Sequence, residues 1–108
     1  MMIFKRKPTT PGEILEEEYL KPLGMTQRQL AQHIGYDIKV INRLVNNRTS
    51  LSADMALKLA ATFRTTPEFW LNAQKAVDLY EASQEIKKLP APIFMKRSFL
   101  STGIGEKS

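Results

Sequence analysis

One segment constrains the fold of this 108-residue chain more than any other: residues 26–48, with the sequence TQRQLAQHIGYDIKVINRLVNNR. Thr26 is a favourable N-cap for a first short helix, and Gly35 is suited to end it with a positive φ. Asp37 is a favourable N-cap for a second helix, which Asn47 can close in the left-handed conformation. Two short helices joined by a turn that contains glycine are typical of a helix-turn-helix, whose second helix can enter the DNA major groove.

The apolar residues of this segment follow helical spacing on both sides of the turn. Leu30, Ala31 and Ile34 lie on one face of the first predicted helix, while Ile41 and Leu44 lie on one face of the second. We expect Ala31 to be small because the second helix crosses close to it. A plain helical hairpin within a bundle remains the alternative interpretation of this pattern.

Similar start signals predict three further helices. The run Thr10-Pro11-Gly12-Glu13 combines an N-cap, a proline at the first helical position and a capping box. Ile14, Leu15, Tyr19, Leu20 and Leu23 should form the buried stripe of that helix, with Pro22 and Gly24 ending it. Ser52 should cap a helix over residues 53–63, and Thr66 a helix from Pro67 to about Ile86 with Phe69 and Trp70 in the core.

The chain is therefore predicted to be an all-α, five-helix bundle with one domain. We expect an N-terminal arm at residues 1–8, a helix-turn-helix domain at residues 9–87, and a C-terminal tail at residues 88–108. The apolar residues Ile93, Phe94, Met95, Phe99 and Leu100 indicate a tail that is either flexible or docked on a partner.

Several classes of function are poorly supported by the composition. The chain has no cysteine and one histidine, His33, so neither a thiolate site nor a histidine cluster for a metal can form. Its five glycines are scattered and form no phosphate-binding loop. We therefore expect no enzyme activity, no metal and no cofactor. The N-terminus lacks the long apolar run of a secretory signal, and no segment is long enough to span a membrane; we expect a cytoplasmic protein.

The positive charge is unevenly distributed along the sequence. The net charge is +5, and residues 21–52 carry five lysines or arginines against a single acid, Asp37. Residues 1–10 and 87–108 are also basic, whereas residues 11–20 carry only acids. A basic face on a small helical domain is typical of a nucleic-acid-binding protein, although lysines also serve solubility.

The outward positions of the second helix of the motif are the candidates for reading DNA bases. Arg43 and Lys39 suit the O6 and N7 atoms of guanine, and Asn42 suits N6 and N7 of adenine. The full set of candidate base contacts is Asp37, Ile38, Lys39, Val40, Asn42, Arg43 and Asn46. The candidate phosphate contacts, which position the protein, are Gln27, Arg28, Arg48 and Thr49. One such domain reads a half-site, so we expect a homodimer on an inverted repeat.

The runs TPGEILEEEYLKPLGMTQRQLAQHIGYD and INRLVNNRTSLSADMALKLAATFRTTPEFWLNAQKAVDL resemble the HigA-type antitoxins, XRE-class, lambda-repressor-like helix-turn-helix proteins. The most specific pieces are TPGE, ADMALKLA and TTPEFWLN. The resemblance spans about residues 9–80. It implies a five-helix bundle and a homodimer that binds an inverted-repeat operator and represses its own operon. It also implies a partner, a HigB-type toxin that cleaves mRNA.

The head of the second helix departs from the family pattern. Small polar or basic residues are usual there, whereas this chain has Asp37, Ile38, Lys39 and Val40. The two apolar residues predict either contacts with thymine methyl groups and hence an unusual operator, or weak DNA binding and another role for this face; we favour DNA binding. Two alternatives stay open: a stand-alone XRE-class regulator without a toxin, and a protein-interaction module whose arms capture a partner and whose DNA-binding motif is vestigial.

Overall fold

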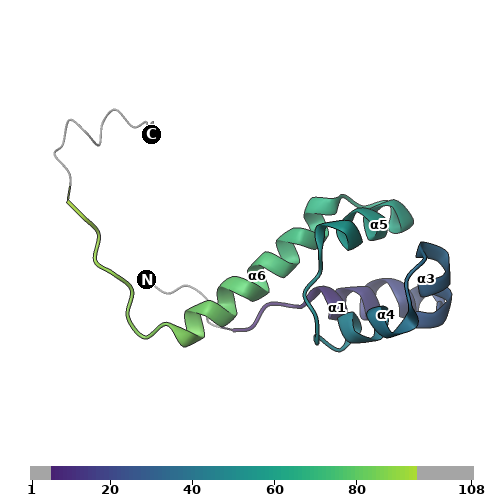
Figure 1. Ribbon diagram of the computed structural model, residues 1–108, viewed down its shortest axis with the longest axis horizontal. Helices are drawn as coiled ribbons and strands as arrows, with labels where there is room; N and C mark the ends of the chain where they lie inside the picture. The colour runs from purple at the N-terminus through teal and green to yellow at the C-terminus, as the bar shows by residue number, and fades with distance from the viewer. Residues whose placement is uncertain (1–5, 95–108) are drawn as a thin grey trace.

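The structure, a computed structural model, describes residues 6–94, and within that range it contains five helical segments and no strand (Figure 1). The all-α prediction is confirmed. The first segment is continuous and comprises α1 (Pro11–Ile14), the π-helical η1 (Leu15–Leu20) and α2 (Lys21–Leu23). The other four are α3 (Gln27–Ile34), α4 (Ile38–Val45), α5 (Ala53–Phe63) and α6 (Pro67–Glu85).

The predicted start of the first helical segment is confirmed in detail. The Thr10 hydroxyl accepts a hydrogen bond from the Glu13 backbone N–H at 3.1 Å, and the Glu13 carboxylate accepts one from the Thr10 N–H at 3.0 Å. This reciprocal pair satisfies two backbone groups that the helix leaves without partners. Pro11 occupies the first helical turn, where its missing N–H costs nothing.

The expectation that Pro22 stops this helix is wrong. Pro22 lies inside α2, and the chain leaves the helix only at Gly24, which has a φ of 64°. A proline normally crowds the carbonyl four residues before it and offers that carbonyl no hydrogen bond. Here the preceding turns are wound as a π-helix, in which the Lys21 N–H donates to the carbonyl of Glu16, five residues back. The wider winding accommodates the proline ring within the helix.

The hydrophobic core lies where the first segment, α3, α4, α5 and the start of α6 meet. Its largest fully buried side chains are Leu15, Leu20, Leu30, Ile41, Leu44, Leu59 and Trp70. Trp70 satisfies its only polar group by donating from Nε1 to the Thr65 hydroxyl at 2.7 Å. Tyr19 and Phe63 pack beside the indole, with ring centroids at 5.4 and 6.5 Å.

Two residues expected in the core are instead exposed. Leu23 retains 61% of its accessible surface because it lies in the last turn of α2, beyond the covered part of the helix. Phe69 retains 39% and covers the edge of the Trp70 ring in a T-shaped contact. Leu51, in the loop before α5, is also buried, although the sequence analysis assigned it to no helix.

Helix α6 begins against α5 and then runs past the rest of the bundle (Figure 1). Residues 86–94 continue from it without regular structure, and the side chains of Ile93 and Phe94 are exposed. The first five residues of the expected arm and tail residues 95–108 lie outside the described residues. The division into arm, domain and tail at residues 1–8, 9–87 and 88–108 stays a prediction. No helix in the described range has the length and apolar character needed to cross a membrane.

Candidate nucleic-acid interface

The corner between α3 and α4 forms as the sequence predicted. The Thr26 hydroxyl accepts from the Gln29 N–H at 3.0 Å, and the Gln29 side chain accepts from the Thr26 N–H, which makes a capping box. Gly35 ends α3 with a φ of 81°, a conformation that glycine adopts without steric cost. Asp37 begins α4 by accepting from the Lys39 N–H at 2.8 Å, and Asn47 closes it with a φ of 59°.

Helix α4 is held on its inner side by apolar side chains and by a direct backbone contact. Ile41 and Leu44 are fully buried against the core. Gly12 of the first segment lies so close to the C-terminal end of α4 that an added Cβ would be 2.0 Å from the Leu44 carbonyl oxygen. The first helical segment therefore fixes the position of α4 with little freedom, which leaves the opposite face of α4 exposed in a defined orientation.

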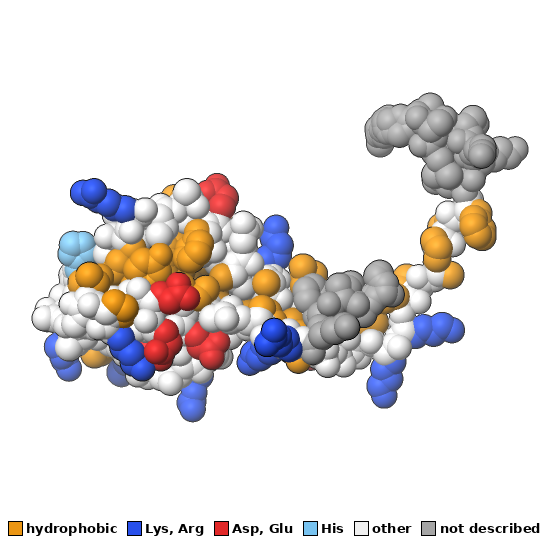
Figure 2. All heavy atoms as spheres, turned by 180° about the vertical axis from the view of Figure 1, so that it is seen from behind, with side chains coloured by type: hydrophobic (Ala, Val, Ile, Leu, Met, Phe, Trp, Pro, Cys, Tyr) orange, Lys and Arg blue, Asp and Glu red, His pale blue; other side chains and the backbone are white. Residues whose placement is uncertain are grey.

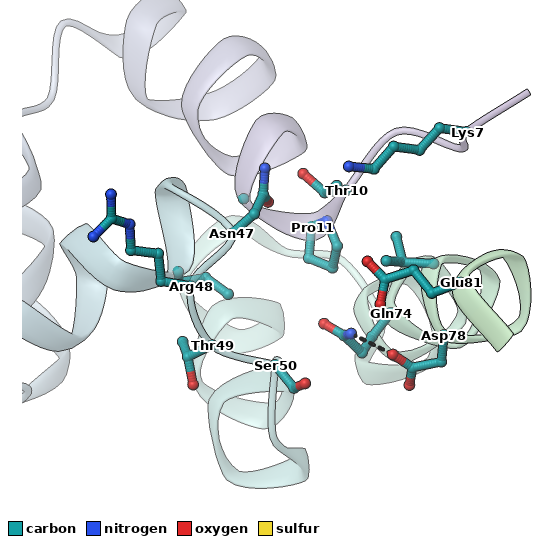
Figure 3. Close-up of a pocket in the computed structure, with 13 residues that line it drawn as sticks. Lys7, Thr10, Pro11, Asn47, Arg48, Thr49, Ser50, Gln74, Asp78 and Glu81 are labelled. Carbon is teal, nitrogen blue, oxygen red and sulfur yellow. Dashed lines mark hydrogen bonds between the residues drawn. The ribbon is translucent and has the colours of Figure 1, made fainter. Parts of the chain in front are cut away.

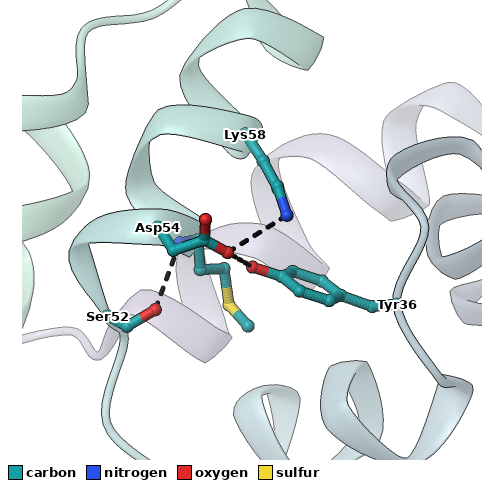
Figure 4. Close-up of polar contacts among 5 residues, drawn as sticks. Tyr36, Ser52, Asp54 and Lys58 are labelled. Carbon is teal, nitrogen blue, oxygen red and sulfur yellow. Dashed lines mark hydrogen bonds and ion pairs between the residues drawn. The ribbon is translucent and has the colours of Figure 1, made fainter.

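A polar network, which sequence reasoning missed, ties the turn of the corner to α5 (Figure 4). The Tyr36 hydroxyl donates to the Asp54 carboxylate. The Lys58 ammonium lies 3.1 Å from that carboxylate and 4.6 Å from the centroid of the Tyr36 ring. Asp54 and Lys58 are four residues apart on α5, but Tyr36 is 18 residues before Asp54, so helical periodicity does not connect it to them. Only the packing of α5 against α3 brings them together.

The pKa values of this network shift in the directions that the contacts require. Burial, helped by the bond to Asp54, raises the pKa of Tyr36 above its ordinary value of 10.0. The bonds from Tyr36 and Lys58 lower the pKa of Asp54 below 3.8, while the bond to Asp54 raises the pKa of Lys58 above 10.5. Each contact thus stabilises one charge state: Tyr36 is neutral, Asp54 is anionic and Lys58 is cationic.

The exposed face of α4 carries most of the predicted base-contacting side chains. Lys39, Asn42 and Arg43 are exposed along the helix, and Asn46 is exposed at its C-terminal end. The Asn46 side-chain amide donates to the backbone carbonyl of Asn42 at 2.9 Å. Asp37 is exposed as well, but its carboxylate already serves as the helix cap. The face therefore combines two cations with two amides, the groups that read purine edges in the major groove.

The two apolar residues at the head of α4 lie differently from their polar neighbours. Ile38 and Val40 are half-buried and pack against the core. Ile38 also lines a shallow cavity of about 320 Å³ together with Gln27, Lys39, Asn42 and Arg43. The Asn42 amide donates to Gln27 Oε1 across this cavity at 3.1 Å. This contact between the two helices was not predicted, because nothing in the sequence relates positions 27 and 42.

The predicted phosphate contacts flank this face on two sides. Gln27 and Arg28 open α3, whose N-terminus carries partial positive charge, and Arg48 and Thr49 are exposed just after α4. Behind Arg48 and Thr49, a polar cavity of about 280 Å³ separates this loop from Lys7 and from Asp78 and Glu81 on α6 (Figure 3). The Arg48 side chain extends away from those two acids, so its charge is directed outward (Figure 3).

Acidic and basic side chains are both visible on one face of the molecule. The face drawn in Figure 2 shows acidic side chains beside an apolar area, with lysines and arginines towards its edges. Within residues 6–94, no group of three or more histidine, cysteine, aspartate or glutamate residues is arranged to hold a metal ion.

The chain is similar to known helix-turn-helix proteins over most of its length. The helix-turn-helix family model matches residues 17–70. Antitoxin HigA-1 of Vibrio cholerae serotype O1 is 43% identical over 94 residues, which cover 84% of this chain and 89% of that protein. An uncharacterized HTH-type transcriptional regulator, YbaQ of Escherichia coli K12, is 45% identical over 82 residues, which cover 76% of this chain and 73% of that protein.

Solved structures of related proteins share the fold. Pseudomonas aeruginosa antitoxin HigA with higBA promoter superimposes with a TM-score of 0.69 at 32% identity, covering 78% of this chain and 100% of that one. Antitoxin GraA in complex with its operator gives a TM-score of 0.67 at 37% identity, covering 84% of this chain and 100% of that one. Both were determined with DNA bound.

Proposed function

Because the chain belongs to the helix-turn-helix family of HigA-type antitoxins, we propose that it is a DNA-binding antitoxin that represses its own operon. The observation that carries this proposal is the division of α4 into two faces. Ile41 and Leu44 are fixed in the core, and Lys39, Asn42 and Arg43 are exposed on the other side. An exposed helix with this chemistry fits the width of the major groove.

The side chains of the corner take different roles in this function. Arg43 and Lys39 donate to guanine, and Asn42 pairs with adenine. Ile38 and Val40 contact thymine methyl groups with their apolar surface. Asp37 and Asn46 lie at the two ends of the exposed face of α4. The contacts of Gln27, Arg28, Arg48 and Thr49 go to phosphate oxygens, which fix the register of the protein without reading sequence.

Two copies of the chain bind one operator. A single α4 reads only a few base pairs, and a second copy related by a two-fold axis doubles the contacts on an inverted repeat. The structures of related antitoxins with promoter or operator DNA support binding to an operator. The second partner is a HigB-type toxin, which the chain neutralises by binding; the similarity to antitoxin HigA-1 over 84% of the chain supports it.

DNA binding is tested by measuring the affinity of the full chain for the DNA upstream of its own gene, with random duplex as reference and salt as the variable. We expect tight, sequence-dependent binding by a dimer and a steep fall in affinity with salt. Arg43→Ala should cost about 1–3 kcal/mol and relax specificity at one base pair. Arg28→Ala should weaken binding to all sequences alike and reduce the salt slope. Equal affinity for upstream and random DNA would refute the proposal.

A stand-alone regulator without a toxin is the second candidate, favoured by the 45% identity to a protein described as a transcriptional regulator. The two functions differ in their protein partner and not in their DNA contacts. An adjacent gene for a small basic protein that co-purifies with this chain and is inactivated by it would establish the antitoxin. If no neighbouring gene product binds the chain while operator binding is intact, the stand-alone regulator is the correct function.

A further inference from the structure

The hydrogen bond between Gln27 and Asn42 links the first residue of α3 to the exposed, base-contacting face of α4. Its donor is the Asn42 side-chain nitrogen, and its acceptor is Gln27 Oε1 at 3.1 Å. Gln27 is half-buried and Asn42 is exposed, so one end of the pair is held by packing while the other faces outward. The pair and Ile38 line the shallow cavity described above.

An asparagine amide has two N–H donors and one carbonyl acceptor. The bond to Gln27 uses one of the two donors and fixes which way the amide plane points. The remaining N–H and the carbonyl oxygen then present one donor and one acceptor. Adenine offers the complementary pair, N7 as acceptor and the N6 amino group as donor, whereas guanine offers two acceptors, O6 and N7. In this orientation, the Asn42 amide can form both hydrogen bonds with adenine but only one with guanine.

We propose that Gln27 is a specificity-determining positioning residue that holds the Asn42 amide in the orientation that reads adenine. The inference rests on the proposed DNA-binding function and deepens it. Ile38 also favours an A·T pair at this position. It lines the cavity beside Asn42, and an A·T pair carries the thymine methyl group that apolar side chains contact. Gln27 keeps its own NH₂ group for a phosphate oxygen, so its phosphate contact and its positioning role are compatible.

Gln27→Lys separates these two roles. Lysine keeps a donor for the phosphate and adds a positive charge, but it has no acceptor for the Asn42 N–H. Its ammonium instead favours the Asn42 carbonyl oxygen, which turns both amide donors toward the base. If Gln27 only contacts phosphate, Gln27→Lys should leave the base specificity unchanged, with equal or higher affinity. A positioning residue predicts a loss of the preference for adenine over guanine at one base pair.

The experiment uses the full chain and a randomised duplex library to find the preferred site, followed by affinities for that site with A·T or G·C at each position. Asn42→Ala identifies the position that Asn42 reads. There we expect the wild-type chain to prefer A·T by about tenfold or more. For Gln27→Lys we expect that ratio to fall below about threefold or to reverse, while the added positive charge raises affinity for random duplex. Arg28→Ala is the matched control, because it should lower all affinities and keep the ratio.

The double variant Gln27→Lys, Asn42→Ala distinguishes positioning from an independent effect. If Gln27 acts through Asn42, adding Gln27→Lys to Asn42→Ala leaves the base preference of Asn42→Ala unchanged. Thermal unfolding of each variant checks that the fold is intact. A wild-type ratio retained in Gln27→Lys would overturn the inference while leaving the proposed function standing. A wild-type chain that selects no sequence at all would refute the proposed function and this inference with it.

Discussion

The corner formed by α3 and α4 and the long helix α6 both carry apolar residues at helical spacing, yet they differ in how completely these residues are buried. In the corner, Leu30, Ile41 and Leu44 are almost completely buried. In the 19-residue α6, only Trp70 and Val77 are buried, and Leu79 retains 51% of its accessible surface. Both regions have favourable caps, so the difference does not come from how their helices begin.

The difference comes from what surrounds each helix. The two helices of the corner cover each other and are covered in turn by the first helical segment and α5. Helix α6 is covered where it meets α5 and α1, as far as Val77, and then runs past the bundle (Figure 1). Helical periodicity shows which side of a helix is apolar, but only the arrangement of the other helices determines how far along that side is buried.

The comparison is tested most strongly by truncating large side chains at the two ends of α6. Trp70→Ala removes a fully buried indole and its bond to Thr65, and we expect it to lower the free energy of unfolding by about 3–5 kcal/mol. Leu79→Ala, on the projecting half of the same helix, should cost within about 0.5 kcal/mol. Chemical denaturation followed by circular dichroism measures both.

A large loss of stability in Leu79→Ala would contradict this account. It would mean that the projecting half of α6 is covered in solution, for example in the proposed homodimer. Repeating the measurement over a range of protein concentrations separates the two cases, because stability that depends on assembly rises with concentration.

The contact of Gly12 with α4 tests how tightly the covered region is packed. In Gly12→Ala the new methyl group would lie 2.0 Å from the Leu44 carbonyl oxygen, and the neighbouring atoms are backbone that cannot rotate away. We expect a loss of about 2 kcal/mol, in the range of overpacked sites, although alanine is otherwise the better helix former. Glu18→Ala, on the exposed side of the same helical segment, is the control and should be nearly neutral. Gly12→Ala with wild-type stability would show that the first segment can move away from α4.

The secondary structure was predictable because its signals are local. Thr10, Thr26, Asp37, Ser52 and Thr66 each accept a backbone hydrogen bond as their position before a helix indicated. The error at Pro22 has the same origin, since the rule that proline ends a helix assumes α-helical winding, and here the winding widens. The exposure of Leu23 and Phe69 depends on tertiary contacts that no local rule contains.

The candidate site was predictable to a similar extent. The outward direction of Lys39, Asn42 and Arg43 follows from helical spacing against the buried Ile41 and Leu44, and the structure places them so. The bond between Gln27 and Asn42 and the network around Tyr36 could not be predicted. The first joins α3 to α4 and the second joins the turn after α3 to α5, so the partners in both depend on how the helices pack.

The N-caps test whether local structure is equal in the two regions. Thr26→Ala removes the cap of α3, and Thr66→Ala removes the cap of α6. We expect each to lower the free energy of unfolding by about 1 kcal/mol, because both hydroxyls accept from a backbone N–H at the third helical position. Thr26→Ser and Thr66→Ser, which keep the hydroxyl, should recover most of the loss. Markedly unequal effects of the two alanine variants would show that the caps also carry tertiary interactions.

The smallest expected effect concerns Tyr36, which joins the corner to α5. Tyr36→Phe keeps the ring beneath Lys58 but removes the hydroxyl that donates to Asp54. We expect it to cost less stability than the loss of an N-cap.

This effect should depend on pH. Because the pKa of Asp54 is lowered from 3.8, the contribution of Asp54 to the free energy of unfolding is fully present above that pH and is lost as pH falls through the folded-state pKa. Because the pKa of Tyr36 is raised from 10.0, its contribution is present below that pH and disappears as pH rises through the folded-state value. The difference in unfolding free energy between wild type and Tyr36→Phe should therefore be constant between about pH 5 and pH 9 and shrink on either side. A difference that stays the same down to about pH 2 would mean that the bond to Asp54 contributes nothing, and that the corner is held against α5 by apolar packing and the Lys58 contact alone.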